Sequence, residues 1–196
     1  MARIIPSDKY SKKELIVNKA AFLFRKNGFD ATSMRELAEN IGVEAPSLYN
    51  HIGSKNEILQ KICFDTAGLF NSNLEKELKS SDTPFKRLEN LIRFHIQKMV
   101  NNYDEVYVSD HEWRHLPDPF LTNFLNQRKK YEEKLVAIVK DSIEKNEIKN
   151  IHPYVAVLTI LSAVKGLQTW QKRKKNISAI TLENDMVEHL LNGLKK

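Results

Sequence analysis

The 196-residue sequence has a single cysteine, Cys63, and it has no long uninterrupted run of apolar residues. One cysteine cannot form an intramolecular disulfide, which fits a reducing compartment, and we interpret Cys63 as a small buried apolar residue. The first ten residues lack the apolar core of a signal peptide, and no window approaches the ~20 apolar residues of a membrane span. We therefore expect a soluble, cytoplasmic protein that does not associate with a membrane.

The charge balance is mildly basic rather than extreme. Lysine and arginine number 31 against 25 acidic residues, which gives a net charge of +6 at pH 7 and a pI near 9.2. Such a balance favours a polyanionic partner but is too modest to prove one. A chain of this length is sufficient for one sizeable core, or for a small domain followed by a larger one.

The stretch 33–52 has the pattern of two short helices joined by a tight turn. Ser33 and Glu36 form a capping-box pattern that begins the first helix, and Gly42 can end it in a left-handed conformation. Pro46 is suited to the first turn of the second helix, which we expect to continue as far as Gly53. The apolar stripe of the first helix consists of Met34, Leu37, Ala38 and Ile41. This arrangement predicts a helix-turn-helix, whose second helix enters the major groove of DNA.

The second helix of this motif has one inward apolar residue, Leu48, and otherwise small, hydroxylated or amide-bearing side chains. Such side chains suit close approach to base edges and phosphates. Ser54 and Glu57 form another capping pattern, which puts Lys55 on the first turn of the next helix. There its ammonium group and the free backbone N–H groups can both serve a phosphate.

The segment 16–62 resembles the N-terminal domain of the TetR family of bacterial transcriptional regulators. The resemblance is carried by AAFLFRKNGFDATSMRELAENIGVEAPSLYNHIGSKNEIL. It implies a dimeric, ligand-released repressor with an all-helical core, and it covers the first third of the chain. The motif and the resemblance together predict these DNA-binding residues: Thr32, Ser33, Arg35, Glu44, Ala45, Pro46, Ser47, Tyr49, Asn50, His51 and Lys55.

The remaining periodicity predicts an all-α fold with about nine helices. A first helix over 11–27 should support the motif, and further helices are expected over 55–78, 88–99 and 120–144. Residues 80–84 read as a loop. We expect a helix-turn-helix DNA-binding domain over 1–57, with the motif at 33–52, and a helical effector-binding and dimerisation domain over 58–196. His95 lies on an apolar helix face and is interpreted as a satisfied core residue.

The helix expected over 154–170 is apolar on nearly every side. Such a helix must be covered all round, and in a protein this small the second cover is a further subunit. The last helix offers an apolar stripe of Met186, Val187, Leu190, Leu191 and Leu194. Two such helices from each chain predict a four-helix homodimer interface, as the TetR resemblance also implies. A dimer presents two recognition helices to a palindromic operator.

The sequence HEWRH, residues 111–115, matches the H-E-x-x-H pattern of zinc hydrolases, with His111 and His115 as ligands and Glu112 as the base. Pro117 should end the helix directly after it, and no third ligand stands at a familiar spacing. A zinc hydrolase therefore stays an alternative, as does a helical interaction module that does not bind DNA. Our leading interpretation needs no catalytic residue, no metal and no cofactor.

The run EWRHLPDPFLTNFLNQRKKYEEKL is similar to the C-terminal half of TetR-type regulators that respond to acyl-coenzyme A thioesters. A pocket for such an effector needs an apolar slot together with cations and an aromatic for the headgroup. Ordinary core packing or a solvated face also accounts for each residue that could form it. The predicted effector-binding residues are Phe94, Met99, His111, Trp113, Arg114, Phe120, Phe124, Arg128, Leu161, Lys165 and Trp170. The sequence thus predicts a dimeric repressor that an apolar or acyl-coenzyme A effector releases from a palindromic operator.

Overall fold

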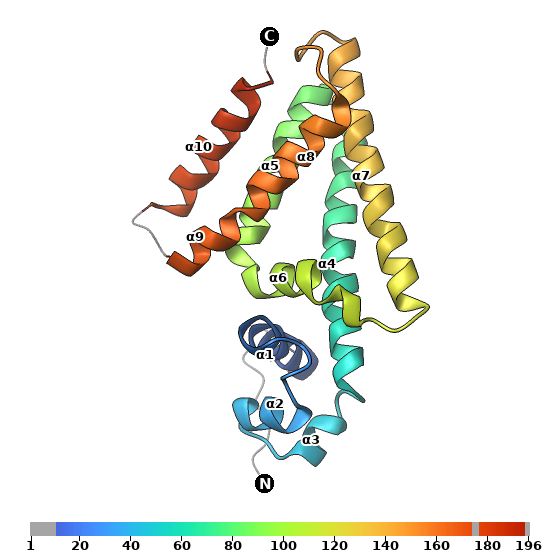
Figure 1. Cartoon of the computed structure of the whole chain (residues 1–196), viewed down its shortest axis with the longest axis vertical. Helices are drawn as coiled ribbons and strands as arrows, with labels where there is room; N and C mark the ends of the chain where they lie inside the picture. The colour runs from blue at the N-terminus through green and yellow to red at the C-terminus, as the bar shows by residue number, and fades with distance from the viewer. Residues whose placement is uncertain (1–10, 174–176, 195–196) are drawn as a thin grey trace. The chain divides into compact units, whose positions relative to one another are not determined.

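The computed structural model describes residues 11–173 and 177–194, with the side chains of residues 172 and 173 excepted. The described residues form ten α-helices and one short 3-10 helix, η1, which confirms the all-α fold class (Figure 1). The helices are α1 Lys12–Asn27, α2 Met34–Ile41, α3 Ala45–Tyr49, α4 Lys55–Leu78, α5 Pro84–Asn101, α6 Tyr103–His111, η1 Trp113–His115, α7 Phe120–Glu144, α8 Pro153–Lys165, α9 Leu167–Arg173 and α10 Ala179–Asn192. The single helix expected over 154–170 is interrupted at Gly166 and is therefore two helices, α8 and α9.

The chain forms two compact units, and its path alternates between them. The first unit contains the residues up to Ala67 together with Asp104–Leu125, and the second contains Gly68–Tyr103 and the residues from Asn126 onward. The helices α4 and α7 each contribute residues to both units. Our expected boundary between the functional domains, at residue 57, stays a prediction.

The first unit is organised around a continuous apolar core. Its first helix begins at a capping box, in which the Ser11 hydroxyl accepts from the Glu14 N–H at 3.2 Å and the Glu14 carboxylate accepts from the Ser11 N–H at 2.7 Å. Backbone N–H groups at a helix start have no partner within the helix, so these two hydrogen bonds fix where α1 begins. The core holds side chains of α1, α2, α3 and α4, and Val108, Leu116 and Phe124 of the later segment also belong to it. The segment 104–125 is thus an integral part of the unit that carries the helix-turn-helix.

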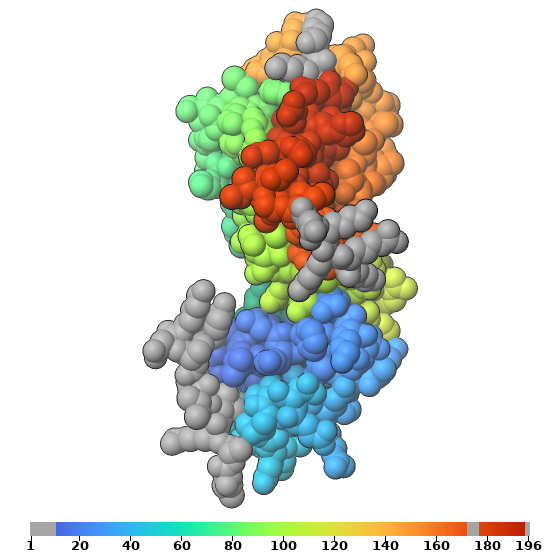
Figure 2. Space-filling view, turned by 90° about the vertical axis from the view of Figure 1, so that its left-hand side faces the viewer, coloured from blue at the N-terminus to red at the C-terminus, as the bar shows by residue number. Residues whose placement is uncertain are grey.

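The second unit is built around α5. Thr83 caps this helix through its hydroxyl, and Pro84 occupies the first turn, where the missing N–H costs nothing. Its buried face holds Leu88, Leu91, Ile92, Ile96 and Met99. Helices α8, α9 and α10 each pack against α5, and Figure 2 shows α10 in red beside the green of α5. None of the helices in the described ranges is both long enough and apolar enough to cross a membrane.

Candidate DNA-binding surface and effector core

The turn between α2 and α3 forms as the sequence predicts. Ser33 caps α2 by accepting from the Glu36 N–H at 3.1 Å, and Gly42 takes the left-handed conformation, with φ 80° and ψ 33°. The Glu36 carboxylate does not complete the capping box, because it accepts from the side-chain amide of Asn27 at 2.8 Å. Directly after Gly42, the Val43 N–H donates to the Ala38 carbonyl at 3.0 Å, which closes the turn. Figure 1 shows α2 and α3 as consecutive short helices.

Helix α3 is shorter than we predicted. It ends at Tyr49 rather than continuing to Gly53, and residues 50 and 51 form a turn. The backbone N–H groups of His51 and Ile52 both donate to the Leu48 carbonyl, at 3.0 and 3.2 Å. Leu48 and Ile52 are buried, at 0 % and 2 % exposure. The chain leaves the helix after Tyr49, and this turn carries Ile52 into the core.

Most of the predicted DNA-binding set is accessible at the surface of the first unit. Tyr49 is a large aromatic member of the set, with 51 % of its surface exposed. Its hydroxyl and ring are therefore available to a duplex, whereas the neighbouring Leu48 is buried. The exposed members are Ser33, Arg35, Glu44, Pro46, Tyr49 and Asn50, and the half-buried ones are Ala45, Ser47 and His51.

Thr32 is the exception in this set, because it is buried at 1 % exposure. Its hydroxyl donates to the Gly28 carbonyl at 2.9 Å and so ties the loop between α1 and α2 to the end of α1. A buried, bonded hydroxyl cannot reach a duplex, so the structure contradicts a direct DNA contact at Thr32. The sequence alone does not show whether a threonine hydroxyl near a helix start is accessible or buried.

Lys55 makes contacts that sequence reasoning did not anticipate. Its ammonium group donates to the Phe29 carbonyl at 2.8 Å and to the Asp30 carbonyl at 3.3 Å. The same nitrogen lies 4.3 Å from the centre of the Phe29 ring. Lys55 therefore fastens α4 to the loop between α1 and α2, and a phosphate contact at this residue stays a prediction.

The two histidines of HEWRH do not lie on one continuous helix. Helix α6 ends at His111, whereas His115 closes η1. His111 is bonded through Nδ1 to the Tyr107 carbonyl at 2.9 Å, and its ring stacks on that of Tyr107 at 4.2 Å. Because the helix breaks at Glu112, the one-turn spacing of a zinc hydrolase is lost. No group of three histidine, cysteine, aspartate or glutamate side chains suits a metal ion within residues 11–173 and 177–194.

The rest of HEWRH packs against the helix-turn-helix core. The Phe29 N–H donates to the Glu112 carboxylate at 3.4 Å, and the His115 ring stacks on Phe29 with the centroids 5.1 Å apart. The His115 ring nitrogens also lie 3.5 Å from the Asp30 carboxylate and 3.4 Å from that of Glu112. An ion pair between Arg25 and Asp104 joins α1 to the start of α6. These contacts give the motif a packing role, in which Glu112 and His115 hold the same loop that Lys55 holds.

The predicted effector residues are divided between the two units. One group belongs to the first unit, where Phe124 is 1 % exposed and contacts Phe64 edge to face at 5.9 Å. That group consists of His111, Trp113, Arg114, Phe120 and Phe124. The other group belongs to the second unit and consists of Phe94, Met99, Arg128, Leu161, Lys165 and Trp170. Sequence reasoning treated 111–128 as one stretch and therefore missed this division.

A small apolar cavity lies inside the second unit, and its lining includes one predicted effector residue, Leu161. The cavity measures about 10 Å³, and its lining consists of Leu88, Leu91, Ile92, His95, Leu135, Val157, Ile160 and Leu161. His95 Nε2 is hydrogen-bonded to the Tyr131 hydroxyl at 2.7 Å. Burial, together with the positive charge of Lys165, lowers the pKa of His95 to about 4. The imidazole is thus neutral at pH 7. Tyr131 was not predicted, although it follows the apolar spacing of α7.

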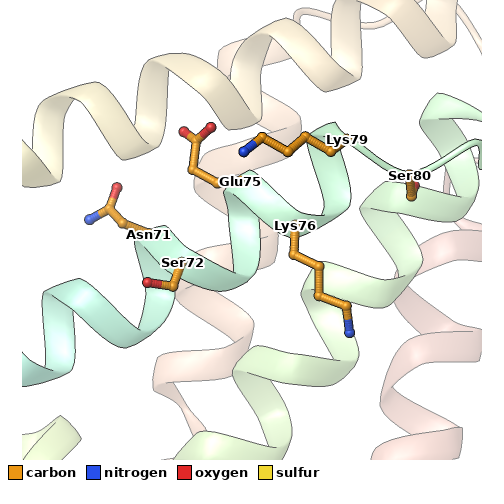
Figure 3. A pocket seen from close by; sticks show the side chains of 6 residues that line it. All are labelled: Asn71, Ser72, Glu75, Lys76, Lys79 and Ser80. Atoms are coloured by element: carbon orange, nitrogen blue, oxygen red, sulfur yellow. The ribbon is translucent and has the colours of Figure 1, made fainter.

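An open hollow of about 730 Å³ also lies on the second unit, beside α4 (Figure 3). Figure 3 shows the Lys79 side chain extending towards Glu75, and Glu75 also pairs with Lys134. These lysines lower the pKa of Glu75, chiefly through the Lys134 hydrogen bond. The hollow is lined by Asn71, Ser72, Glu75, Lys76, Lys79 and Ser80. The hollow is open, and every side chain in its lining ends in a polar or charged group.

The chain resembles transcriptional regulators in sequence, among them the following two. The HTH-type transcriptional repressor KstR2 of Mycolicibacterium smegmatis is 24% identical over 144 residues, which cover 73% of this chain and 70% of the relative. The Fatty acid metabolism regulator protein of Bacillus subtilis is 22% identical over 188 residues, covering 95% of this chain and 97% of the relative. The solved structure of AibR in complex with isovaleryl coenzyme A and operator DNA has a TM-score of 0.79 at 23% identity, and covers 91% of this chain and 97% of that one.

Two family models match different parts of the sequence. Residues 16–62 match the model described as bacterial regulatory proteins, tetR family. Residues 81–194, more than half of the chain, match the tetracyclin repressor-like C-terminal domain. The first match covers α2, the Gly42 turn and α3, and the second covers α5 and the helices that pack on it. The chain therefore belongs to the TetR family of bacterial regulatory proteins, and it is a DNA-binding transcriptional regulator.

Proposed function

We propose that the protein is a homodimeric repressor that binds a palindromic operator and is released by an acyl-coenzyme A type of effector. The observation that carries the DNA-binding part is the outward presentation of α3 and the turn after it: Pro46, Tyr49 and Asn50 are exposed while Leu48 anchors the helix in the core. Such a helix suits the major groove, where short polar side chains reach base edges. A repressor of this kind acts in the cytoplasm, where its operator lies, and it performs no chemistry.

The exposed apolar face of α8 supports a homodimer. Tyr154, Val155 and Leu158 are 47 %, 53 % and 50 % exposed, although each is a large apolar or aromatic side chain. Large apolar side chains clustered at a surface mark a site of protein association. A second copy of α8, joined by α10, would cover this face. Two recognition helices would then lie about one DNA turn apart, as a palindrome requires.

The effector class rests on the relatives. AibR is solved with isovaleryl coenzyme A, and the Bacillus subtilis relative is a regulator of fatty acid metabolism. An acyl chain needs an apolar interior, and the second unit has one around α5, α7 and α8. Release follows if the effector prefers a conformation in which the recognition helices no longer match the groove spacing. The coupling energy of such a shift is typically ~1–3 kcal/mol.

Two steps test this proposal. Selection of bound fragments from a random DNA library should recover a palindrome, and octanoyl-coenzyme A should then lower the affinity for that duplex by about 5- to 150-fold. Tyr49→Ala should weaken the operator complex by about 10-fold or more and leave the affinity for octanoyl-coenzyme A unchanged. Recovery of no palindrome would contradict the DNA-binding part, and undiminished DNA binding at saturating octanoyl-coenzyme A would contradict the effector part.

A further inference from the structure

We propose that His95 and Tyr131 form the polar anchor of the effector site, and that the cavity beside them opens to take an apolar chain bearing an uncharged carbonyl oxygen. This inference deepens the proposed function and rests on it for the identity of the natural effector. It names two residues of the second unit as the ones that recognise the acyl group.

The cavity is lined by side chains of three helices, and all of them are aliphatic except His95. The lining of α5 includes Leu88, that of α7 includes Leu135, and that of α8 includes Val157. An apolar slot with one polar group is the usual design of a site that binds a small apolar ligand and fixes its orientation. His95 is therefore positioned to read the single polar atom of such a ligand.

The hydrogen-bonded pair has one donor left over, whichever tautomer His95 adopts. A neutral imidazole has one N–H, and the Tyr131 hydroxyl has one O–H. The 2.7 Å bond between His95 Nε2 and the hydroxyl uses only one of these two hydrogens. If Tyr131 donates this bond, the His95 Nδ1–H remains available to another acceptor. If His95 donates it, the Tyr131 O–H remains available. The pair can thus give one hydrogen bond to a ligand acceptor.

The surroundings favour an uncharged acceptor over a carboxylate. Phe70 packs on both rings, with its centroid 4.6 Å from that of His95 and 6.3 Å from that of Tyr131. Burial keeps His95 uncharged at neutral pH, since its pKa is lowered to about 4. Lys165, whose charge acts on His95, is itself exposed. A carboxylate would lose its hydration here without gaining a buried cation, whereas a thioester or ketone carbonyl would lose much less.

The small volume of the cavity suggests how ligand binding leads to release of the operator. A volume of about 10 Å³ is at the lower limit for a single water molecule, which needs roughly 10–15 Å³. A ligand must therefore separate the side chains of α5, α7 and α8 before it can enter. A ligand that binds only the opened conformation of this core has a higher affinity for that conformation than for the closed one. This difference in affinity shifts the protein towards the opened conformation. One of the three helices, α8, is also the helix proposed to form the dimer.

Matched probes with and without a carbonyl test the anchor in the full-length protein. The variant His95→Leu/Tyr131→Phe removes both partners together, because a single substitution would leave one buried polar group unpaired. We expect the affinity ratio of 2-hexanone to n-hexane to fall about 5- to 20-fold in this double variant, from the loss of one hydrogen bond. Tyr103→Phe is the matched control, since it also removes a hydroxyl from a protein hydrogen bond in the second unit and lies outside the cavity lining. Its ratio should equal that of the wild type.

A spectroscopic measurement on the wild type makes the result independent of the variants. The ¹⁵N resonances of the His95 ring should shift with 2-hexanone and stay unchanged with n-hexane. An unchanged His95 spectrum at saturating 2-hexanone, or an unchanged affinity ratio in the double variant, would overturn the proposal. Operator release by octanoyl-coenzyme A separates the two hypotheses. If octanoyl-coenzyme A releases the operator but the affinity ratio is unchanged in the double variant, only the anchor is rejected. If the ratio falls as expected but octanoyl-coenzyme A does not release the operator, only the proposed effector is rejected.

Discussion

Helices α3 and α8 are both accessible at the surface, but their exposed side chains differ in chemistry. The exposed residues of α3 are Pro46 and Tyr49, which has a hydroxyl, and the exposed Asn50 follows directly after the helix. The exposed residues of α8 include Val155 and Leu158, each with about half of its surface accessible, at 53 % and 50 %. Hydroxyl and amide groups can exchange water for phosphates and base edges, whereas apolar side chains gain most from another protein surface. The contrast indicates two different partners, a duplex for α3 and a second subunit for α8.

The interiors of the two units differ in a related way. In the first unit, the segment 104–125 contributes to the same apolar core as the helix-turn-helix, and Lys55, Glu112 and His115 all bind the loop after α1. The second unit instead contains a small cavity with a neutral His95 on its wall. Many mutually supporting contacts favour one conformation, while a cavity with an unspent donor favours ligand entry. We therefore expect perturbations of the second unit to change ligand response and those of the first unit to change DNA affinity.

The largest effect should come from breaking the proposed dimer at Leu158→Asp. A carboxylate cannot be buried in an apolar interface without a partner, so the variant should be a monomer in sedimentation. Loss of the second recognition helix should then lower operator affinity by about 100-fold or more in a mobility-shift titration. Leu125→Asp is the control, because Leu125 is exposed to a similar degree, at 41 %, on α7. If Leu158→Asp remained dimeric, the α8 face would not be the interface.

Acid should destabilise the protein through His95. Its native pKa of about 4 lies below the ordinary value near 6.5, so the unfolded state binds the proton first as the pH falls. This contribution is intact above pH 6.5 and is lost between pH 6.5 and about 4, on the order of 2–3 kcal/mol. Urea unfolding at pH 7.5 and 4.5 measures it. The double variant His95→Leu/Tyr131→Phe should lose less stability over that interval, and equal losses would contradict the assignment.

Lys55→Ala distinguishes a structural role from a phosphate contact. Because Lys55 donates to the Phe29 and Asp30 carbonyls, we expect the free energy of unfolding to fall by about 1–2 kcal/mol. Lys61→Ala on the same helix is the control, since Lys61 forms a partly exposed pair with Asp65 of its own helix, and such a pair is worth about 0.5 kcal/mol. A Lys55→Ala variant of unchanged stability, whose salt dependence of DNA binding is reduced by about one ion, would instead support the phosphate contact.

Local signals in the sequence predicted the helices and turns well. The features that depend on long-range packing could not be predicted from such signals. The Ser33 cap, the Gly42 turn and the position of α4 followed from capping and periodicity, which act within a few residues. The early end of α3 did not follow, because it depends on Ile52 reaching a core that other helices complete. The role of HEWRH was also hidden, since its packing partner, Phe29, lies more than 80 residues earlier. Tyr131 resembled any other residue of an apolar stripe until its hydroxyl was seen to meet His95.

The smallest effect compares two glycines, one in each unit. Gly68 lies inside α4, at the start of the second unit, and a Cβ there would meet nothing within 4 Å. Glycine inside a helix costs roughly 0.5–1 kcal/mol relative to alanine, so Gly68→Ala should raise the free energy of unfolding by that amount. Gly42→Ala makes the same chemical change where φ is +80°, and it should instead lower stability because alanine is strained there. Thermal unfolding of both variants should thus give shifts of opposite sign. If Gly68→Ala also lowered the melting temperature, the backbone at residue 68 would need a conformation other than that of a straight helix.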